Sequence, residues 1–333
     1  MAPTARLDHQ VSAANQLFIG GLFYQRQVHD IEQRYTIAGL FDAWEVPGWN
    51  DTIWLTEQQR IDRDWAAFGQ VSFDFTDRLT GTVGMRAFRS NNTLEGFFGF
   101  GAGFSSKTGE AACFGGAINT SPPFPNRLTD HFHGAPCVNL DRGIEETGTT
   151  HSVNLTYHFN PDVMVYGTWS TGFRPGGVNR RIFQQALYNS DTVTNYEAGF
   201  KSSWDENRVR FNVAVFQEDW SDFQFSFLGA NGLTEVRNAG DARIRGVEGD
   251  LTWRPFEGFT LTAAATYLHG EILQNYCALL LDGSQTTDCP SLSALLAPSG
   301  TRLPVTPEVK ADLTARQEFQ MMGTDAYWQI AMV

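Results

Sequence analysis

The sequence predicts an all-β protein, and more narrowly an incomplete antiparallel transmembrane β-barrel of about 11 or 12 strands. Three observations predict it. Apolar and polar side chains alternate with a period of two over most of the chain, as in strands with a single apolar face. The connections between these segments are alternately short and long. Aromatic residues are numerous, at 26 Phe, 9 Trp and 9 Tyr, and many lie near segment ends, where membrane barrels carry aromatic girdles.

The first clear strand pair covers residues 65–75 and 79–87, which are separated by a short polar break. The odd positions of the first segment are apolar and include Val71 and Phe73, while Gln, Ser and Asp occupy even positions. The same parity continues in the second segment, so the two segments predict a hairpin with one apolar face. A further strand is expected upstream, around residues 15–28.

Three more pairs and one single strand repeat this pattern downstream. Turn-forming residues such as Asn, Asp, Pro and Gly separate the members of each pair. The strands are 151–159 with the segment that begins at 163, 193–202 with 208–217, 243–253 with 259–269, and a last clear strand at 309–316. Most of these segments run for about nine to twelve residues, close to the length that crosses a bilayer.

The connections alternate in length along the chain. Consecutive antiparallel strands place alternate turns at opposite ends, so all the short turns lie at one end of the sheet and all the long loops at the other. Outer-membrane barrels have this asymmetry, with long extracellular loops. We therefore expect residues 1–333 to form one partial barrel domain with long extracellular loops near 90–148, 173–191 and 271–306.

Composition excludes several other classes of protein. The formal net charge of −13 argues against nucleic acid as a partner, because phosphate-binding surfaces carry an excess of Lys and Arg. The chain also lacks the long apolar run that a membrane-spanning helix needs. The first ten residues lack the apolar core of a secretory signal, so either the chain is cytoplasmic or its natural start lies upstream.

The four cysteines form two pairs, and each pair falls inside one loop rich in Gly, Ser and Pro. Cys113 with Cys137 and Cys277 with Cys289 are candidate disulfides that close loops in an oxidising compartment. Four unrelated thiols remain the alternative. The spacing within each pair is wider than structural zinc sites use, so a zinc site is disfavoured.

Four ordered motifs resemble the TonB-dependent outer-membrane receptors. An aromatic strand followed by Gly-Phe-Arg-Pro-Gly-Gly is typical of that family, as are the strands and turns that follow it. The motifs are VYGTWSTGFRPGGVNRR at 165–181, TVTNYEAGFKSSWDENRVRFNVAVFQEDWSDFQ at 192–224, NAGDARIRGVEGDLTWRPFEGFTLTAAATY at 238–267 and RLPVTPEVKADLTA at 302–315. Together they cover about 150 residues, and the N-terminal half adds alternation without distinctive motifs.

The sequence also departs from the family pattern. Family members carry an N-terminal plug domain, a short TonB-contacting box and a closing strand with an aromatic end. None of these is recognisable here, and plugged transporters have barrels of about 22 strands. The expectation is therefore a receptor barrel whose plug and last strands are missing, and which as it stands does not transport.

The resemblance implies active uptake of a scarce large nutrient, most often an iron–siderophore complex, at the bacterial outer membrane. The implied partners are outer-membrane lipid and lipopolysaccharide, the ligand, and the TonB complex in the full-length receptor only; no cofactor is implied. Arginine forks bind oxyanions well. The candidate ligand-facing loop residues are Phe173, Arg174, Asn179, Arg180 and Arg181, with an ordinary solvated loop as the alternative.

The sequence assembles neither a nucleophile with its base nor a metal-ligand set, so we expect no enzyme and no metal site. Two other classes of protein stay open. A soluble or surface carbohydrate-binding all-β module would bury the apolar face of its sheet against a second sheet. A passive porin-like channel would close its barrel within this chain.

Overall fold

A computed structural model describes residues 5–13, 16–101, 131–180, 186–228, 234–278, 286–304 and 306–333, the first of these segments by its backbone alone. Strands dominate the described segments. The helical elements among them are two single turns, η1 (Asp42–Trp44) and η3 (Leu292–Ala294). None of the described helices is long and apolar enough to cross a membrane.

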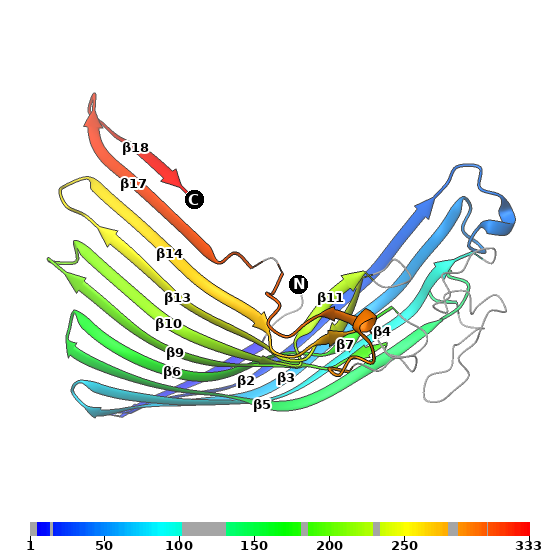
Figure 1. Cartoon of the computed structure of the whole chain (residues 1–333), viewed down its shortest axis with the longest axis horizontal. Helices are drawn as coiled ribbons and strands as arrows, with labels where there is room; N and C mark the ends of the chain where they lie inside the picture. The colour runs from blue at the N-terminus through cyan, green and yellow to red at the C-terminus, as the bar shows by residue number, and fades with distance from the viewer. Residues whose placement is uncertain are drawn as a thin grey trace.

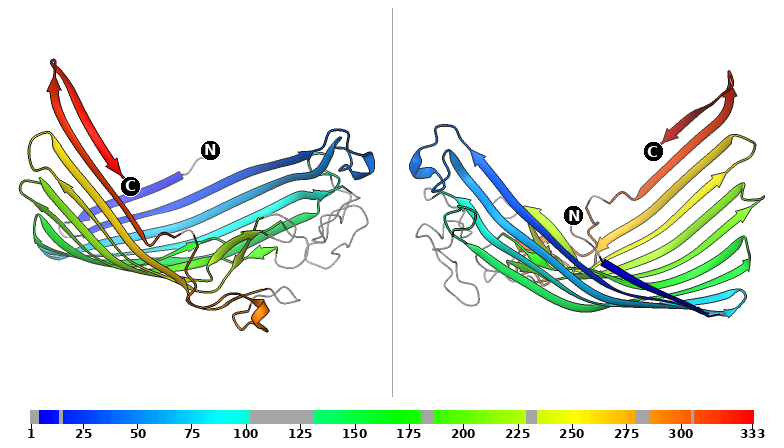
Figure 2. Two further views of the ribbon diagram at one scale, coloured as in Figure 1. Left: turned by 45° about the horizontal axis from the view of Figure 1, so that its top comes forward. Right: turned by 180° about the vertical axis from the view of Figure 1, so that it is seen from behind.

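Twelve antiparallel strands form one curved sheet, and each pairs with the next sheet strand along the chain. Figures 1 and 2 show a trough with short turns at one end and long connections at the other. The edge strands β1 and β18 do not pair with each other, so the sheet is open, as expected of an incomplete barrel. The strands are β1 (Ala5–Ala13), β2 (Gln16–Thr36), β3 (Thr52–Thr76), β4 (Leu79–Phe100), β5 (Leu140–Asn160), β6 (Val163–Arg174), β9 (Asp191–Trp204), β10 (Val209–Ser221), β13 (Ala242–Trp253), β14 (Phe259–Ile272), β17 (Val309–Met321) and β18 (Thr324–Met332).

The four hairpins that the alternation predicts are confirmed, and their registers place apolar residues opposite apolar residues. Val71 pairs with Val83 across β3 and β4, and Val247 pairs with Tyr267 across β13 and β14. Because side chains alternate between the two faces, these pairs keep every apolar set on one side of the sheet. The alternation in the sequence is thus the pattern of a sheet with one apolar face.

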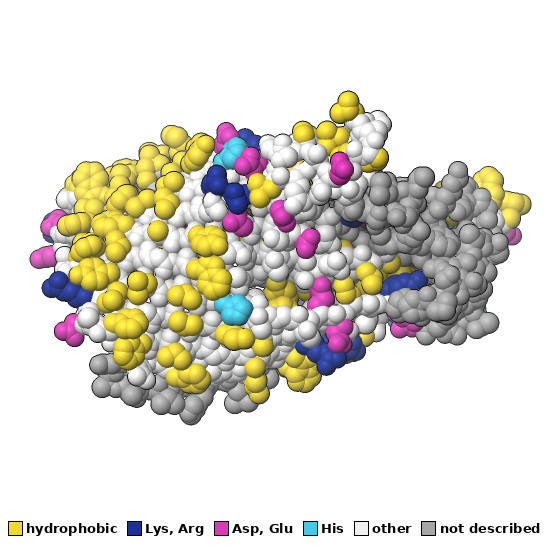
Figure 3. Space-filling view, turned by 60° about the horizontal axis from the view of Figure 1, so that its bottom comes forward, with side chains coloured by type: hydrophobic (Ala, Val, Ile, Leu, Met, Phe, Trp, Pro, Cys, Tyr) yellow, Lys and Arg dark blue, Asp and Glu magenta, His cyan; other side chains and the backbone are white. Residues whose placement is uncertain are grey.

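That apolar face is the outer, convex face of the trough, and it is exposed. Figure 3 shows hydrophobic side chains over the half of this face nearest the short turns, with charged side chains towards the long connections. Among the described residues, no second sheet or helix packs against this face. The exposed side chains include Phe18, Leu22, Trp65, Val71, Phe73, Val83, Met85, Val153, Leu155, Tyr157, Tyr196, Phe211, Val215, Val247 and Tyr267.

Four strands are much longer than the sequence predicted. The strands β2 to β5 run for 21, 25, 22 and 21 residues, whereas β6, β9, β10, β13, β14 and β17 run for 12 to 14. The extra length lies at the long-connection end, where β2 to β5 project beyond the others (Figure 1). Their polar stretches hide the strand signal, because neither face there meets lipid.

The projecting ends of β3 and β4 have a buried cluster on each face. Trp54, Leu94, Phe98 and Leu140 form one cluster, and a second one contains Leu55 and Phe97 with residues of the neighbouring loops. Consecutive residues such as Phe97 and Phe98 face opposite sides of a strand. The projection is therefore a packed structure in its own right rather than a pair of bare strands.

The long connections differ in part from their predicted bounds. The first spans residues 101–139 instead of about 90–148, because β4 and β5 continue through both ends of the predicted loop. The other two, after Arg174 and after Ile272, agree closely with the prediction. A further long connection between β10 and β13 was not expected. It carries the hairpin β11 (Gln224–Leu228) with β12 (Thr234–Asn238).

Two smaller strand pairs lie in the other connections, β7 (Gly177–Val178) with β8 (Leu187–Tyr188) and β15 (Tyr276–Cys277) with β16 (Leu295–Ala297). The structure joins Cys277 to Cys289, with 5.4 Å between their Cα atoms. Cys137 is buried and disulfide-bonded. Its expected partner Cys113 lies outside the described residues, so that pairing stays a prediction.

Candidate functional site

The candidate site lies on the inner face of the sheet, where β5 and β6 separate. Their pairing ends at Ser152 opposite Ser170, although β5 continues upward to Leu140 and β6 stays paired with β9 as far as Arg174 opposite Asp191. A cavity of about 570 Å³, which we call the lower cavity, is lined by inner-face residues of the projecting strands and by the start of the β6–β9 connection.

Charged side chains on the wall of the lower cavity bind one another. Arg60 Nε lies 3.0 Å from Asp62 Oδ2, and His29 Nε2 lies 3.9 Å from the same carboxylate. The side-chain amide of Asn92 also donates to Asp62. This part of the wall thus surrounds the Asp62 carboxylate with basic and amide neighbours, an arrangement suited to a polar ligand with several donors and acceptors.

An arginine surrounded by aromatic rings lies at the base of this wall. Arg86 Nη2 is 3.0 Å from Asp64 Oδ2, and its guanidinium carbon lies 5.6 to 5.8 Å from the ring centroids of Phe23, Phe88 and Phe173. Phe173 stacks on Phe88 with 3.5 Å between centroids. Phe173, one of the residues that the sequence predicts to face the ligand, therefore lines the lower cavity. Its stack on Phe88 also bridges the gap between β6 and the projecting strands.

Glu146 of β5 anchors the β6–β9 connection across the same gap. Its Oε2 accepts a hydrogen bond from the backbone N–H of Gly176 at 2.8 Å, and its Oε1 accepts one from Ser190 N–H at 2.7 Å. One carboxylate thereby satisfies two backbone donors, one near each end of the connection. Such charge-assisted bonds are stronger than neutral ones, so this residue fixes where the connection leaves the sheet.

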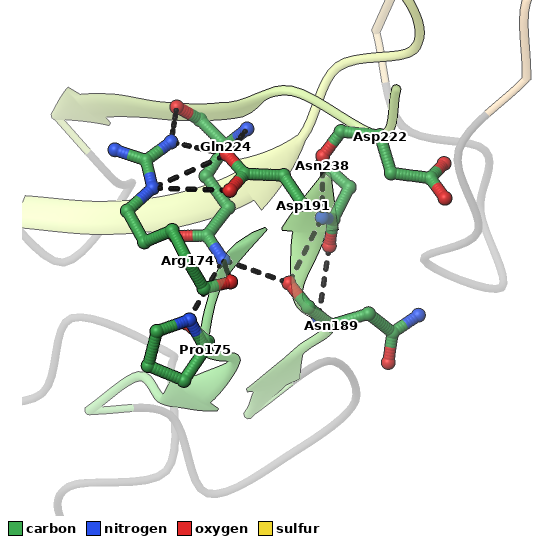
Figure 4. A network of polar contacts seen from close by, with 7 residues as sticks. All are labelled: Arg174, Pro175, Asn189, Asp191, Asp222, Gln224 and Asn238. Atoms are coloured by element: carbon green, nitrogen blue, oxygen red, sulfur yellow. Dashed lines mark hydrogen bonds and ion pairs between the residues drawn. The ribbon is translucent and has the colours of Figure 1, made fainter. Parts of the chain in front are cut away.

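Arg174 is about half exposed, yet its guanidinium contacts other parts of the protein and does not line either side of the lower cavity. Its Nε lies 3.2 Å from Asp191 Oδ2, its Nη2 donates to the backbone oxygen of Gln224 at 2.9 Å, and its guanidinium lies over the ring of Trp220. Figure 4 shows this network. The Gln224 side-chain amide in turn donates to the backbone oxygens of Pro175 and Asn189. The network joins two connections that lie far apart in sequence.

Asn179, which lies further along the β6–β9 connection, has a comparable structural role. Its side-chain amide donates to Val236 O at 2.8 Å, and its side-chain oxygen accepts from Val236 N–H at 2.8 Å. The amide thus imitates a strand neighbour for the edge of β12. Both Arg174 and Asn179, which the sequence offers as ligand contacts, use their polar groups to hold the connections together.

A second cavity of about 450 Å³, the upper cavity, lies beside the first and shares Arg60 and Ile31 with it. Arg180, Tyr35 and Tyr188 also line it. Burial lowers the pKa of Arg180 and raises the pKa of Tyr188. The guanidinium keeps its charge at neutral pH, and the Tyr188 phenol keeps its proton there, because its pKa is raised. The upper cavity therefore presents two cations and two hydroxyl groups.

Three of the predicted site residues line the cavities, Phe173 in the lower one and Asn179 with Arg180 in the upper one. Arg181 lies outside the described residues. Sequence reasoning missed Arg60, Glu146 and the two tyrosines. A parity signal for Arg60 did exist, because it shares even numbering with Gln70 on the inner face of β3. The predicted strand starts only at residue 65, so the prediction does not extend to Arg60.

Comparisons with known proteins agree with this architecture. Residues 3–331 match the family model described as TonB dependent receptor-like, beta-barrel. An uncharacterized TonB-dependent receptor of Haemophilus influenzae is 24% identical over 146 residues, which are 44% of this chain and 41% of that protein.

Solved structures with the same fold include two receptors. The ferric yersiniabactin uptake receptor FyuA from Yersinia pestis has a TM-score of 0.65 at 16% identity, over 98% of this chain and 40% of that one. The siderophore receptor PiuA from Acinetobacter baumannii has a TM-score of 0.62 at 14% identity, over 94% and 42%. The chain spans well under half the length of each of these proteins.

The match covers nearly the whole chain, and the open sheet with its exposed apolar outer face is what a piece of such a barrel requires. The resemblance stated from the sequence motifs is thereby confirmed. The chain belongs to the TonB-dependent receptor family and forms part of the β-barrel that these receptors place in the outer membrane.

Proposed function

We propose that the protein to which this chain belongs takes up an anionic metal chelate, an iron–siderophore complex foremost, through the outer membrane with energy from the TonB complex. The ligand is first held in the upper and lower cavities on the inner face. The proposal rests on one observation. The upper cavity is lined by Arg60, Arg180, Tyr35 and Tyr188. Two guanidinium groups and two phenols recognise carboxylate or catecholate oxygens.

The surroundings support capture of a rigid, bulky ligand. The Arg174 network and the hydrogen bonds of the Asn179 side-chain amide fix the connections that form the cavity rim. A preorganised rim loses less conformational entropy when a ligand binds. Each of the two cavities has the size of a small-molecule site, since such sites range over about 300–1,000 Å³.

The test measures uptake and binding in cells that express the full-length protein. Labelled ferric complexes of carboxylate, catecholate and uncharged chelators are offered in parallel. We expect the anionic complexes to be accumulated, and we expect Arg60→Gln and Arg180→Gln each to weaken their binding by about tenfold, the size of losing one charge-assisted contact. Arg208→Gln, in the short turn after β9 at the opposite end of the sheet, is the matched control.

Two outcomes would overturn the proposal. Equal binding of anionic and uncharged complexes would show that the guanidinium groups do not select the ligand. Binding without accumulation in cells with a working TonB complex would leave a surface binder rather than a transporter. The exposed apolar outer face argues against the soluble carbohydrate-binding alternative, because a soluble protein would bury a face of that extent.

A further inference from the structure

A buried glutamine without a hydrogen-bond partner lies beside the upper cavity. Gln58 of β3 is 1% exposed, and within the described part of the chain neither its side-chain nitrogen nor its side-chain oxygen has a partner. A buried amide in this state destabilises the protein, because both groups have left water without replacement hydrogen bonds. Such groups are rare in native structures, and a functional role is one reason for their retention.

The register of the sheet places Gln58 in the wall of the upper cavity. Gln58 shares even numbering, and therefore the inner face of β3, with Arg60, which lines both cavities. It pairs with Ile31 of β2 on one side and with Gly96 of β4 on the other. Ile31 and Arg60 line the upper cavity, as does Leu94, two residues before Gly96. Three inner-face neighbours of Gln58 thus form the wall, while the amide between them is closed off from the cavity.

Apolar side chains close off the Gln58 amide. Leu94 and Leu140, which flank Gly96 in the sheet, belong to one buried cluster. Val178 of β7 packs against this cluster and also lines the upper cavity. The strand β7 itself lies against β4 and β5. Val178 therefore covers the cluster from the cavity side, and a ligand that displaces its side chain reaches the surroundings of Gln58.

The chemistry of Gln58 favours a partner with both donors and acceptors. A glutamine side chain offers one acceptor oxygen and two N–H donors on neighbouring atoms. Ligand arms joined by amide groups supply both kinds of partner, a carbonyl oxygen and an N–H group, whereas a carboxylate supplies acceptors alone. The guanidinium groups of Arg60 and Arg180, which line the same cavity, suit anionic oxygens instead. The upper cavity and its wall thus provide separate positions for an anion and for an amide.

We propose that an amide-containing arm of the chelate displaces the Val178 side chain and hydrogen-bonds to Gln58, so that the upper cavity selects anionic chelates whose arms are joined by amides. The inference rests on the proposed function, because the chelate is held in the same cavity. An apolar stretch of the arm replaces the contacts that Val178 makes with the cluster, so little apolar burial is lost. The Gln58 amide gains partners in this exchange, which favours the bound state over the free one.

The experiment measures the affinity of the full-length protein for two ferric complexes of the same charge. One chelator bridges two citrate units through amides, and the other bridges them through esters, which keep the carbonyl oxygen but lack the N–H donor. We expect the unchanged protein to bind the amide complex about tenfold more tightly, the effect of one buried hydrogen bond. Gln58→Leu should abolish this preference without lowering the unfolding temperature, since it removes two unpaired polar atoms. Gln70→Leu, on the same strand and face but outside the lining of both cavities, is the matched control and should keep the preference.

A preference that disappears in Gln58→Leu and persists in Gln70→Leu supports the inference, and one that persists in both variants overturns it. Equal binding of the two complexes by the unchanged protein, with both weakened by Arg60→Gln, would overturn the inference and leave the proposed function intact. Failure to bind either complex would overturn the inference together with its premise that the cavity holds an anionic chelate. If Gln58→Leu fails to assemble, Gln58→Met takes its place, because methionine is unbranched and of similar volume.

Discussion

Single residues hold the rim of the candidate site in place, and Glu146 is the clearest case. It receives two backbone N–H groups from a connection that begins 30 residues further along the chain. Its neighbour Glu145 faces the other side of β5 and forms an exposed pair with Arg89. Two adjacent glutamates therefore have different roles solely because successive side chains of a strand point to opposite faces.

Glu146→Ala should release the ends of the β6–β9 connection. Hydrogen bonds to a charged group contribute about 1.5–3 kcal/mol each, so we expect amide exchange at Gly176 and Ser190 to accelerate by at least about tenfold. Hydrogen–deuterium exchange of the corresponding peptides measures this. Glu145→Ala is the matched control and should leave both amides unchanged, because exposed ion pairs contribute about 0–1 kcal/mol. Equal protection in the two variants would show that the Glu146 anchor is not needed.

The sequence could predict some residues of the candidate site but not others, for a physical reason. Phe173 and Arg180 follow a recognisable strand end, so their loop position is readable. The role of Arg174 is not, because Asp191 and Gln224 come from segments 17 and 50 residues away. Only the folded register brings them within hydrogen-bond distance. A conspicuous loop arginine is thus equally consistent with ligand binding and with an internal ion pair.

At the scale of elements, the membrane-spanning strands were predictable and the projecting ones were not. Alternation arises where one face meets lipid and the other meets polar surroundings. The upper parts of β3 and β4 have packed clusters on both faces, so their apolar residues occur consecutively, as in Phe97-Phe98. Period two disappears there although the backbone ladder continues to Trp54 opposite Phe100.

A disulfide constrains the connection between β14 and β17, and its contribution can be tested. The Cys277–Cys289 bridge closes a segment of 12 residues beside β15 and η3. In the chain-entropy account, a bridge of this size contributes about 3 kcal/mol to ordering its own loop. Replacing both cysteines with serine should therefore increase protease cleavage between residues 273 and 308 several-fold.

The same double variant should not change the stability of the twelve-stranded sheet, because the bridge lies in the separate β15–β16 connection. Limited proteolysis with mass spectrometry, alongside thermal unfolding, separates the two effects. Unaltered cleavage would show that the bridge does not constrain the connection. A lower unfolding temperature of the sheet would show that the connection is part of its folding unit.

At the scale of the whole molecule, the two faces of the sheet should respond oppositely to charge. Val71 is exposed on the outer face near the middle of the apolar band of β3, and Gln70 is its inward neighbour. Val71→Arg should destabilise the full-length protein in the membrane by about 2–4 kcal/mol, the cost of arginine near the bilayer midplane. Gln70→Arg should cost far less, because lumen positions tolerate charge.

Assembly yield in outer membranes, together with unfolding in lipid vesicles, measures this difference. The comparison is clean, because the two positions are adjacent, lie on the same strand and receive the same side chain. Similar losses at both positions would mean that the convex face does not meet lipid, and would reopen the soluble interpretation of the fold.

The parting of β5 from β6 above Ser152 and Ser170 has a mechanical consequence. Below this fork, moving one strand past the other would break a ladder of backbone hydrogen bonds. Above it, the two arms are joined across the gap by side chains such as Glu146 and the stacked Phe88 and Phe173. Widening the gap between the two arms would therefore break a few side-chain contacts and leave the backbone ladder below the fork intact.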